Sequence, residues 1–155
     1  MFSNKGKLRE ARVWIRSELD KCVNFWLKNG MDKENGGVYT CLDRKGEVYS
    51  TDKSVWMQGR CAWTFAWLCK TYGVKQEWLD ASKSCLEFLE KYCINRDKGG
   101  RMYFTVTAEG LPLRQRRYFY SETFYCMANA EYYGITGDKD CLERARWAYD
   151  VYWNL

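Results

Sequence analysis

SVWMQGRCAWTFAWLCKTY, residues 54–72, has the composition and spacing of one long helix, and the rest of the chain is arranged around it. At about 100° per residue, four of its side chains share one stripe, namely Trp56, Arg60, Trp63 and Trp67. Gly59 lies beside this stripe, where the absence of a side chain lets another group approach the backbone closely. The pattern predicts a central helix with an aromatic face and a position of close contact.

A guanidinium within a tryptophan stripe leaves two interpretations open. A buried arginine cannot lose its charge, so it needs an oxygen-rich partner. In the first interpretation, Arg60 pairs with a structural carboxylate inside a core helix. In the second, it binds a polar ligand, and a sugar fits well because its apolar face suits tryptophan and its hydroxyls suit an arginine fork.

Length and composition indicate one globular domain. The 155 residues are 46% hydrophobic and include eight Trp and twelve Tyr, which suits a large core or a carbohydrate cleft. The formal charge of +5 is not accompanied by a nucleic-acid-binding motif, so we expect no nucleic-acid partner. Its densest cluster is Arg114, Arg116 and Arg117. We interpret this cluster as a solvated connector, with phosphate or nucleotide binding as the alternative.

Eight cysteines, no histidine and no CxxC pair argue against a zinc site. Most of the cysteines lie in apolar helical patterns, where a free thiol behaves as a small hydrophobic group. The N-terminus lacks the apolar core of a signal peptide, and no apolar run approaches the ~18 residues of a membrane span. We therefore expect unpaired thiols, no metal, no membrane partner and a cytoplasmic location.

Helical periodicity recurs on both sides of the central segment. Apolar residues at intervals of three and four predict further helices over residues 5–28, 76–93 and 119–133 and from residue 139 onward. Asn4 is the expected cap of the first helix and Gly30 its stop, while Gly134 is the expected stop of the fourth helix. Asp138 is the expected cap of the fifth helix.

The chain also repeats itself. Glycine pairs at 36–37 and 99–100 each lead a short alternating run that predicts a β-hairpin. Trp56 and Tyr120 follow these two pairs at nearly the same distance along the chain. The repeat unit is therefore helix, hairpin, helix, and such units stack because one unit cannot cover its own apolar face. We expect the helices after the hairpins to lie inside, and the first, third and fifth helices to form an outer layer.

Three segments resemble the N-acylglucosamine 2-epimerase family: KSVWMQGRCAWTFAWL, DKGGRMYF and GLPLRQRRYFYSETFYCMANAEYYGITGD. The resemblance covers most of the chain from Gly36 onward. It implies an all-α fold, an (α/α)6 toroid or barrel of helical hairpins, with about the first five helices present and short β-hairpins between helix pairs. Because the array ends without a cap, we expect residues 1–155 to be the N-terminal part of one such domain in a longer protein.

The family interconverts N-acetylglucosamine and N-acetylmannosamine. The resemblance implies that reaction here, by removal of a proton at C2 of the opened sugar and its return to the other face. By position, Arg60 matches an arginine that contacts the sugar oxygens, and Trp56 and Tyr120 match aromatic residues that contact the substrate. The family's two catalytic histidines have no counterpart here. We therefore expect no catalytic residue in these 155 residues and no epimerase activity from them alone.

The resemblance also bears on cofactors and partners. It implies a small sugar as substrate and no cofactor. Nucleotide activation is known in some family members, but no glycine-rich phosphate loop supports it in this sequence. Family members are often dimers, so a homodimer is a further possibility that the residues themselves do not decide.

Three alternatives remain open from the sequence. A cellobiose 2-epimerase or a mannose-type aldose–ketose isomerase uses the same fold. A non-catalytic helical-repeat domain that binds sugar or protein through an aromatic concave face would fit the absence of histidine. A glycoside hydrolase would need two carboxylates facing one cleft, and the candidates are Asp52, Glu122 and Glu131. In the epimerase interpretation Glu122 has no assigned role.

Overall fold

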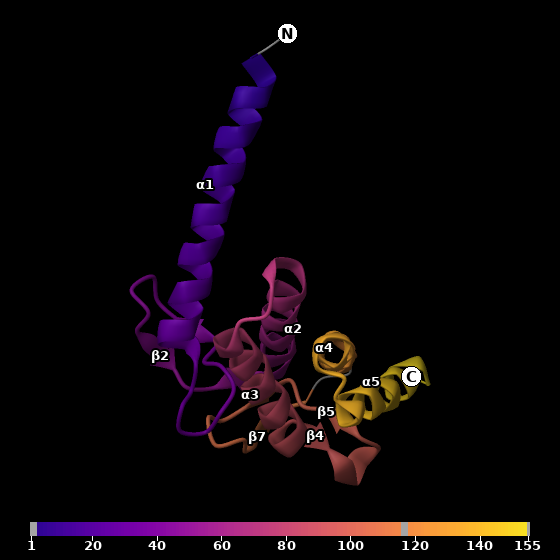
Figure 1. Cartoon of the computed structure of the whole chain (residues 1–155). Helices are drawn as coiled ribbons and strands as arrows, with labels where there is room; N and C mark the ends of the chain where they lie inside the picture. Colours follow the sequence, from indigo (N-terminus) through magenta and orange to yellow (C-terminus); the bar gives the residue numbers. More distant parts are fainter. Residues whose placement is uncertain (1–2, 116–117, 155) are drawn as a thin grey trace.

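Residues 3–115 and 118–154, the part of the chain described by a computed structural model, form five α-helices and several short strands (Figure 1). The helices are α1 Ser3–Phe25, α2 Val55–Tyr72, α3 Gln76–Tyr92, α4 Tyr120–Thr136 and α5 Lys139–Trp153. All five predicted helices are present, and the predicted short strands lie between the helix pairs. None of the described helices is long and apolar enough to cross a membrane.

The strands of the described residues pair in three small antiparallel sheets. β1 Cys41–Leu42 pairs with β2 Val48–Ser50, β4 Ile94–Asn95 pairs with β5 Arg101–Met102, and β3 Lys53–Ser54, β6 Thr105–Val106 and β7 Pro112–Arg114 form the third sheet. The β1–β2 and β6–β7 pairs are the two predicted hairpins. A π-helical turn, η1 Trp26–Gly30, continues α1, and a 3-10 turn, η2 Arg96–Lys98, lies between β4 and β5. Because β3 leads into α2 and pairs with β6, the third sheet joins the two repeat units.

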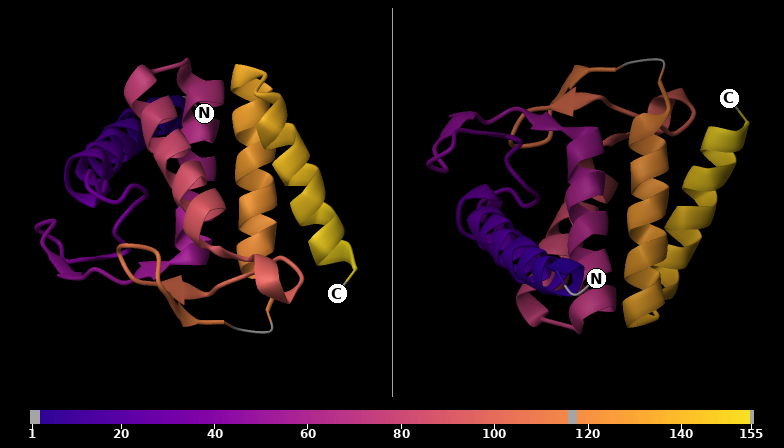
Figure 2. Two further views of the ribbon diagram at one scale, coloured as in Figure 1. Left: turned by 90° about the horizontal axis from the view of Figure 1, so that it is seen from below. Right: turned by 90° about the horizontal axis from the view of Figure 1, so that it is seen from above.

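The two helices that follow the hairpins lie next to each other. α2 and α4 lie side by side, α3 packs on α2, and α5 packs on α4 (Figure 2). In the core between the first pair, Phe65 and Leu68 of α2 pack with Trp78 of α3. In the second pair, Tyr125 of α4 packs with Ala148 of α5. This part of the arrangement agrees with the layers that the repeat predicts.

α1 departs from the predicted outer layer, because most of it projects away from the other helices (Figure 1). Only its C-terminal part is buried, where Val23 packs against Phe65 and Leu68 of α2. Nearer the N-terminus the apolar side chains face solvent: Leu8 is 68% exposed and Trp14 is 65% exposed. The prediction is therefore wrong for most of this helix, since no described element lies beside it to receive those side chains.

Two predicted helix ends are also corrected. Asn4 lies inside α1 and therefore does not cap it. Gly134 lies within α4, which ends at Gly137 in the left-handed conformation, with φ 73°. A helix tolerates an internal glycine, whereas the left-handed turn that stops the helix favours one strongly. Asp138 caps α5 as predicted, because its side chain accepts a hydrogen bond from the backbone N–H two residues later.

A buried ion pair, which the sequence did not predict, joins the segment at residues 32–36 to β3 and to the turn between β6 and β7. The Lys53 side chain is fully buried, and its Nζ lies 2.7 Å from Asp32 Oδ2. The same Nζ donates to the carbonyl oxygens of Gly36 at 2.7 Å and Ala108 at 3.2 Å. Burial on its own would raise the pKa of Asp32. The hydrogen bonds from Lys53 and from two backbone N–H groups outweigh burial and lower the pKa to about 2.

Candidate functional site

The three predicted substrate-binding residues lie together where α2 and α4 begin. Trp56 and Tyr120 occupy the first turns of the two helices, and their rings meet edge to face with centroids 5.7 Å apart. Arg60 follows one turn after Trp56 on α2. Trp56 is half-buried, whereas Arg60 and Tyr120 are exposed, so the group presents an accessible surface.

Phe124, which the sequence did not single out, completes this group. It lies one turn after Tyr120 on α4, and its ring meets that of Trp56 with centroids 5.8 Å apart. The Arg60 Cζ atom lies 5.5 Å from the centroid of the Phe124 ring. We call Trp56, Arg60, Tyr120 and Phe124 the α2–α4 cluster. A phenylalanine in an apolar helix has no chemical signature of a site, so only its contacts identify it.

Gly59 allows α2 and α4 to approach each other closely. A Cβ atom at this position would lie 2.8 Å from the Cβ of Phe124 and 3.0 Å from its carbonyl carbon. Interior packing leaves no room for an added methyl group at such distances. The expectation of a close approach at Gly59 is therefore confirmed, and the atoms that approach belong to Phe124 of α4.

Arg60 has no carboxylate partner in the described part of the chain. The residue is exposed, no Asp or Glu oxygen described there lies within 4.0 Å of its guanidinium, and the guanidinium faces the Phe124 ring. The interpretation of a buried arginine paired with a core carboxylate is therefore wrong, because this face of α2 is open. An aromatic ring occupies none of the five N–H donors of a guanidinium, so those donors can reach a ligand.

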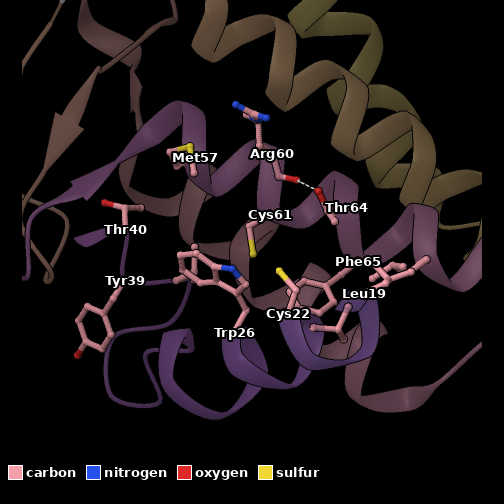
Figure 3. Close-up of a pocket in the computed structure, with 13 residues that line it drawn as sticks. Leu19, Cys22, Trp26, Tyr39, Thr40, Met57, Arg60, Cys61, Thr64 and Phe65 are labelled. Atoms are coloured by element: carbon pink, nitrogen blue, oxygen red, sulfur yellow. Dashed lines mark hydrogen bonds between the residues drawn. The ribbon is translucent and has the colours of Figure 1, made fainter. Parts of the chain in front are cut away.

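Arg60 also borders a pocket of about 250 Å³, which lies between the end of α1, residues 38–40 and α2 (Figure 3). Trp26 contributes an aromatic wall, and Tyr39 and Thr40 also line the pocket, although the Thr40 hydroxyl donates to the Asp52 carbonyl oxygen at 3.2 Å. Burial first, and then neighbouring carboxylates, above all Asp32, raise the pKa of Tyr39 above its ordinary value. In Figure 3 the Arg60 guanidinium extends away from Trp26, toward the side of α2 on which the α2–α4 cluster lies.

These groups suit a polyhydroxylated ligand that develops negative charge. Aromatic faces pack against the C–H face of a sugar, and a guanidinium donates parallel hydrogen bonds to two oxygens. Among the described residues, no group of three His, Cys, Asp or Glu side chains could hold a metal ion. The eight cysteines are unpaired in the structure.

The carboxylates considered for a glycoside hydrolase do not form a pair in one cleft. Glu122 is fully buried, and its Oε1 accepts hydrogen bonds from Arg101 Nε at 2.8 Å and from a backbone N–H at 2.9 Å. Glu131, farther along the same helix, pairs with Lys70 at 2.8 Å, and Asp52 is exposed elsewhere, before α2. Glu122 therefore has a structural role, which answers the question that the sequence left open.

The arginine-rich connector before α4 is described in part. Arg114 is exposed on β7, as expected for a solvated connector, and its Cζ lies 6.0 Å from the centroid of the Phe104 ring. Arg116 and Arg117 lie outside the described residues. Arg101 donates a hydrogen bond to the Tyr118 carbonyl oxygen at 3.2 Å, which ties the segment that enters α4 to β5.

The fold defines a class of protein. Neighbouring inner helices, each backed by the helix that follows it, are the repeat of an (α/α)6 barrel. A solved sugar epimerase from a ruminal bacterium matches this chain with a TM-score of 0.75 at 32% identity, covering 83% of this chain and 33% of that chain. The chain therefore has the (α/α)6 barrel fold of sugar epimerases, with five of its helices described.

Sequence comparison identifies the family. The profile described as N-acylglucosamine 2-epimerase (GlcNAc 2-epimerase) matches residues 37–154, so the chain belongs to the N-acylglucosamine 2-epimerase family. The N-acylglucosamine 2-epimerase of Rattus norvegicus is 39% identical over 138 residues, covering 85% of this chain and 33% of that protein. A cellobiose 2-epimerase of Ruminococcus albus is 35% identical over 133 residues, covering 84% and 33%.

The resemblance stated from the sequence is thus confirmed, and the chain spans about a third of the length of these relatives. All three similar proteins are named epimerases, so they give no support to a non-catalytic binding domain.

Proposed function

We propose that the protein containing this chain is an N-acyl-D-glucosamine 2-epimerase, which interconverts N-acetylglucosamine and N-acetylmannosamine. The observation that carries the proposal is the α2–α4 cluster, in which the Arg60 guanidinium lies beside Trp56, Tyr120 and Phe124 without a carboxylate partner in the described residues. The similarity to a rat N-acylglucosamine 2-epimerase supports this substrate class. In this proposal the chain supplies one wall of the site, with Arg60, Trp56 and Tyr120 as the substrate-binding residues.

The chemistry of C2 epimerisation explains why a guanidinium is suited to this wall. Removing the proton at C2 of the open-chain sugar places negative charge on the neighbouring carbonyl oxygen. A cation held there stabilises the resulting enediolate, an effect of about 3–4 kcal/mol for one well-placed donor. Arg60 cannot lose its charge at neutral pH, and its planar fork reaches two oxygens together. Trp56 and Tyr120 would pack against the sugar carbons.

Proton transfer at neutral pH needs groups whose pKa lies near 7, and histidine is the usual residue. Residues 1–155 contain no histidine, so the acid and the base would come from elsewhere in the whole protein. The reaction removes and returns one proton and therefore requires no redox cofactor. The proposal includes a cytoplasmic location, a role in carbohydrate metabolism and a small sugar as the substrate, with no nucleic-acid or membrane partner.

A cellobiose 2-epimerase is the second candidate. It is favoured by the 35% identity to the Ruminococcus albus enzyme. Both candidates use the same chemistry at C2, so the α2–α4 cluster serves either one. They differ in whether the site holds an acetamido group or a second sugar ring.

The test is an assay of the full-length natural protein in D2O. We expect N-acetylglucosamine to yield N-acetylmannosamine with deuterium at C2, observed by proton NMR, with slower turnover or none on cellobiose. Faster turnover on cellobiose would favour the second candidate, and no exchange at C2 of either sugar would overturn both. The isolated 155-residue chain serves as a matched control. We expect it to be inactive, and turnover by it would contradict the placement of the acid and base outside it.

A further inference from the structure

The contact between Arg60 and Phe124 is a consequence of the repeat. Trp56 and Tyr120 are equivalent positions of the two repeat units, and Arg60 and Phe124 are separated by the same interval along the chain. Both pairs are in contact, at 5.7 Å between ring centroids for the first and 5.5 Å from Cζ to ring centroid for the second. Two successive contacts of this kind require α2 and α4 to run parallel and in register. The position of the Phe124 ring relative to the Arg60 guanidinium is therefore determined by the packing of the two helix backbones.

Gly59 brings the ring of Phe124 within reach of Arg60. Because Gly59 has no side chain, α4 approaches so closely that a Cβ atom there would lie 2.8 Å from Phe124 Cβ. Phe124 is only half-exposed, and its ring is also held at its contact with Trp56. The aromatic surface under Arg60 is thus more restrained than the long arginine side chain that lies over it.

We propose that Phe124 is a positioning residue for the epimerisation, holding the Arg60 guanidinium in place for the sugar. This inference rests on the proposed function, because it takes Arg60 as a substrate contact. A carboxylate could restrain Arg60 as well, but it would occupy N–H donors and offset the positive charge. The face of a ring attracts a guanidinium without doing either, so donors and charge remain directed at the substrate oxygens.

The structure offers a matched control for this role. Phe88 also lies beneath a cation, because Lys53 Nζ is 4.2 Å from the centroid of its ring. Phe88 is buried in the core and its cation belongs to the structural pair with Asp32. The same substitution, Phe→Leu, can therefore be made beneath a structural cation and beneath Arg60.

The experiment compares F124L, F124Y and F88L in the full-length natural protein by kcat and KM for N-acetylglucosamine and by thermal unfolding. We expect F124L to lower kcat/KM about tenfold, because it removes the ring face beneath the guanidinium. F124Y keeps that ring face, so we expect it to retain most of the wild-type kcat/KM. F88L is expected to lower the unfolding temperature with little change in kcat/KM.

A double-mutant cycle separates positioning from general packing. In an R60M background, F124L should cause less than about a twofold further loss, since no guanidinium remains to be held. An F124L variant as active as the wild type would overturn the proposal. A tenfold loss that persists in the R60M background would also overturn it, because the effect would then not act through Arg60.

A readout independent of turnover distinguishes this inference from the proposed function. In protein with 15N-labelled arginine, F124L should shift the Nε–H resonance of Arg60 by removing the ring current, while F88L should leave it unchanged. Inactivity of the wild type on every sugar, with this shift observed, would contradict the proposed function and leave the contact intact. Absence of the shift would overturn the positioning role whatever the activity.

Discussion

Gln58 and Glu122 occupy equivalent positions of the two repeat units, and each accepts a hydrogen bond from the backbone of the segment that precedes its helix. Gln58 Oε1 accepts a hydrogen bond from the Val38 N–H at 2.8 Å, and Glu122 Oε1 accepts one from the Met102 N–H at 2.9 Å. Val38 and Met102 are separated by the same interval as the two acceptors, and both acceptor side chains are fully buried. The repeat therefore extends into the polar interior, where each inner helix holds the segment that precedes it.

This equivalence predicts that E122Q is far better tolerated than E122L. Glutamine keeps the acceptor for Met102 and reproduces the arrangement of Gln58, although it loses the charge that faces Arg101. We expect E122Q to lower the free energy of unfolding by about 1–2 kcal/mol and E122L by about 3 kcal/mol or more, since leucine leaves buried donors unpaired. Urea denaturation measures both values. Equal losses in the two variants would show that the backbone hydrogen bond contributes little.

Acid should weaken the Asp32–Lys53 pair in a defined range. The pKa of Asp32 is lowered to about 2 in the folded protein, against about 3.9 in an unfolded chain. Its contribution is therefore fully present above about pH 4 and is lost as the pH falls toward 2, which amounts to about 2 kcal/mol. We expect the difference in unfolding free energy between wild type and D32N to shrink across this range.

The matched control for that prediction is D52N, because Asp52 is exposed. Its stability should follow the wild type at every pH between 2 and about 7. A difference between wild type and D32N that stays constant from about pH 5 to 2 would contradict the assigned shift.

Replacing Arg60 should affect catalysis and leave folding intact. In the full-length natural protein, we expect R60A to lower kcat by about 100- to 1000-fold, the cost of losing one donor to a developing oxyanion. Because Arg60 is exposed, the thermal unfolding temperature should stay close to that of the wild type. R114A removes an exposed arginine from β7 and should leave kcat unchanged. An R60A enzyme with normal kcat would exclude Arg60 from the reaction.

Two glycines should respond in opposite ways to the same substitution. G59A places a methyl group 2.8 Å from Phe124 Cβ, so we expect a loss of about 1–3 kcal/mol in unfolding free energy as α2 and α4 move apart. G134A lies inside α4 with no atom within 4 Å of the new methyl group, and should stabilise the protein by about 0.5–1 kcal/mol. Chemical denaturation checks both, and a neutral G59A would disprove the tight helix contact.

Parts of the fold and of the candidate site followed from the sequence because they depend on local pattern and on the repeat. The repeat placed Trp56 and Tyr120 on equivalent helices, and the structure brings these two aromatic residues into contact. The choice between Gly134 and Gly137 as the stop of α4 could not be made in the same way. A helix accepts a glycine inside it, and only the backbone angles show that Gly137, and not Gly134, adopts the left-handed conformation that ends α4.

The features that the sequence did not predict are tertiary. Lys53 and Asp32 meet across 21 residues, and no pattern marks a lysine that will be buried. In the sequence Phe124 cannot be distinguished from a core phenylalanine. Only the close approach of α4 at Gly59 shows that its ring lies beneath the Arg60 guanidinium. The sequence left open whether Arg60 is buried, because the stripe of α2 shows which residues share a face, but not whether a neighbour covers that face.

The third sheet also determines the electrostatics of the candidate site. β3 leads directly into α2, and Ser121 in the first turn of α4 donates a hydrogen bond to the Tyr103 carbonyl oxygen, just before β6, at 3.2 Å, so both helices begin beside this sheet (Figure 2). The unpaired N–H groups of a helix N-terminus carry a partial positive charge of about half an elementary charge. Two such ends therefore lie beside Trp56 and Tyr120, where they add to the field of Arg60. The backbone therefore stabilises a ligand atom that becomes negative there, independently of the side chains of the site.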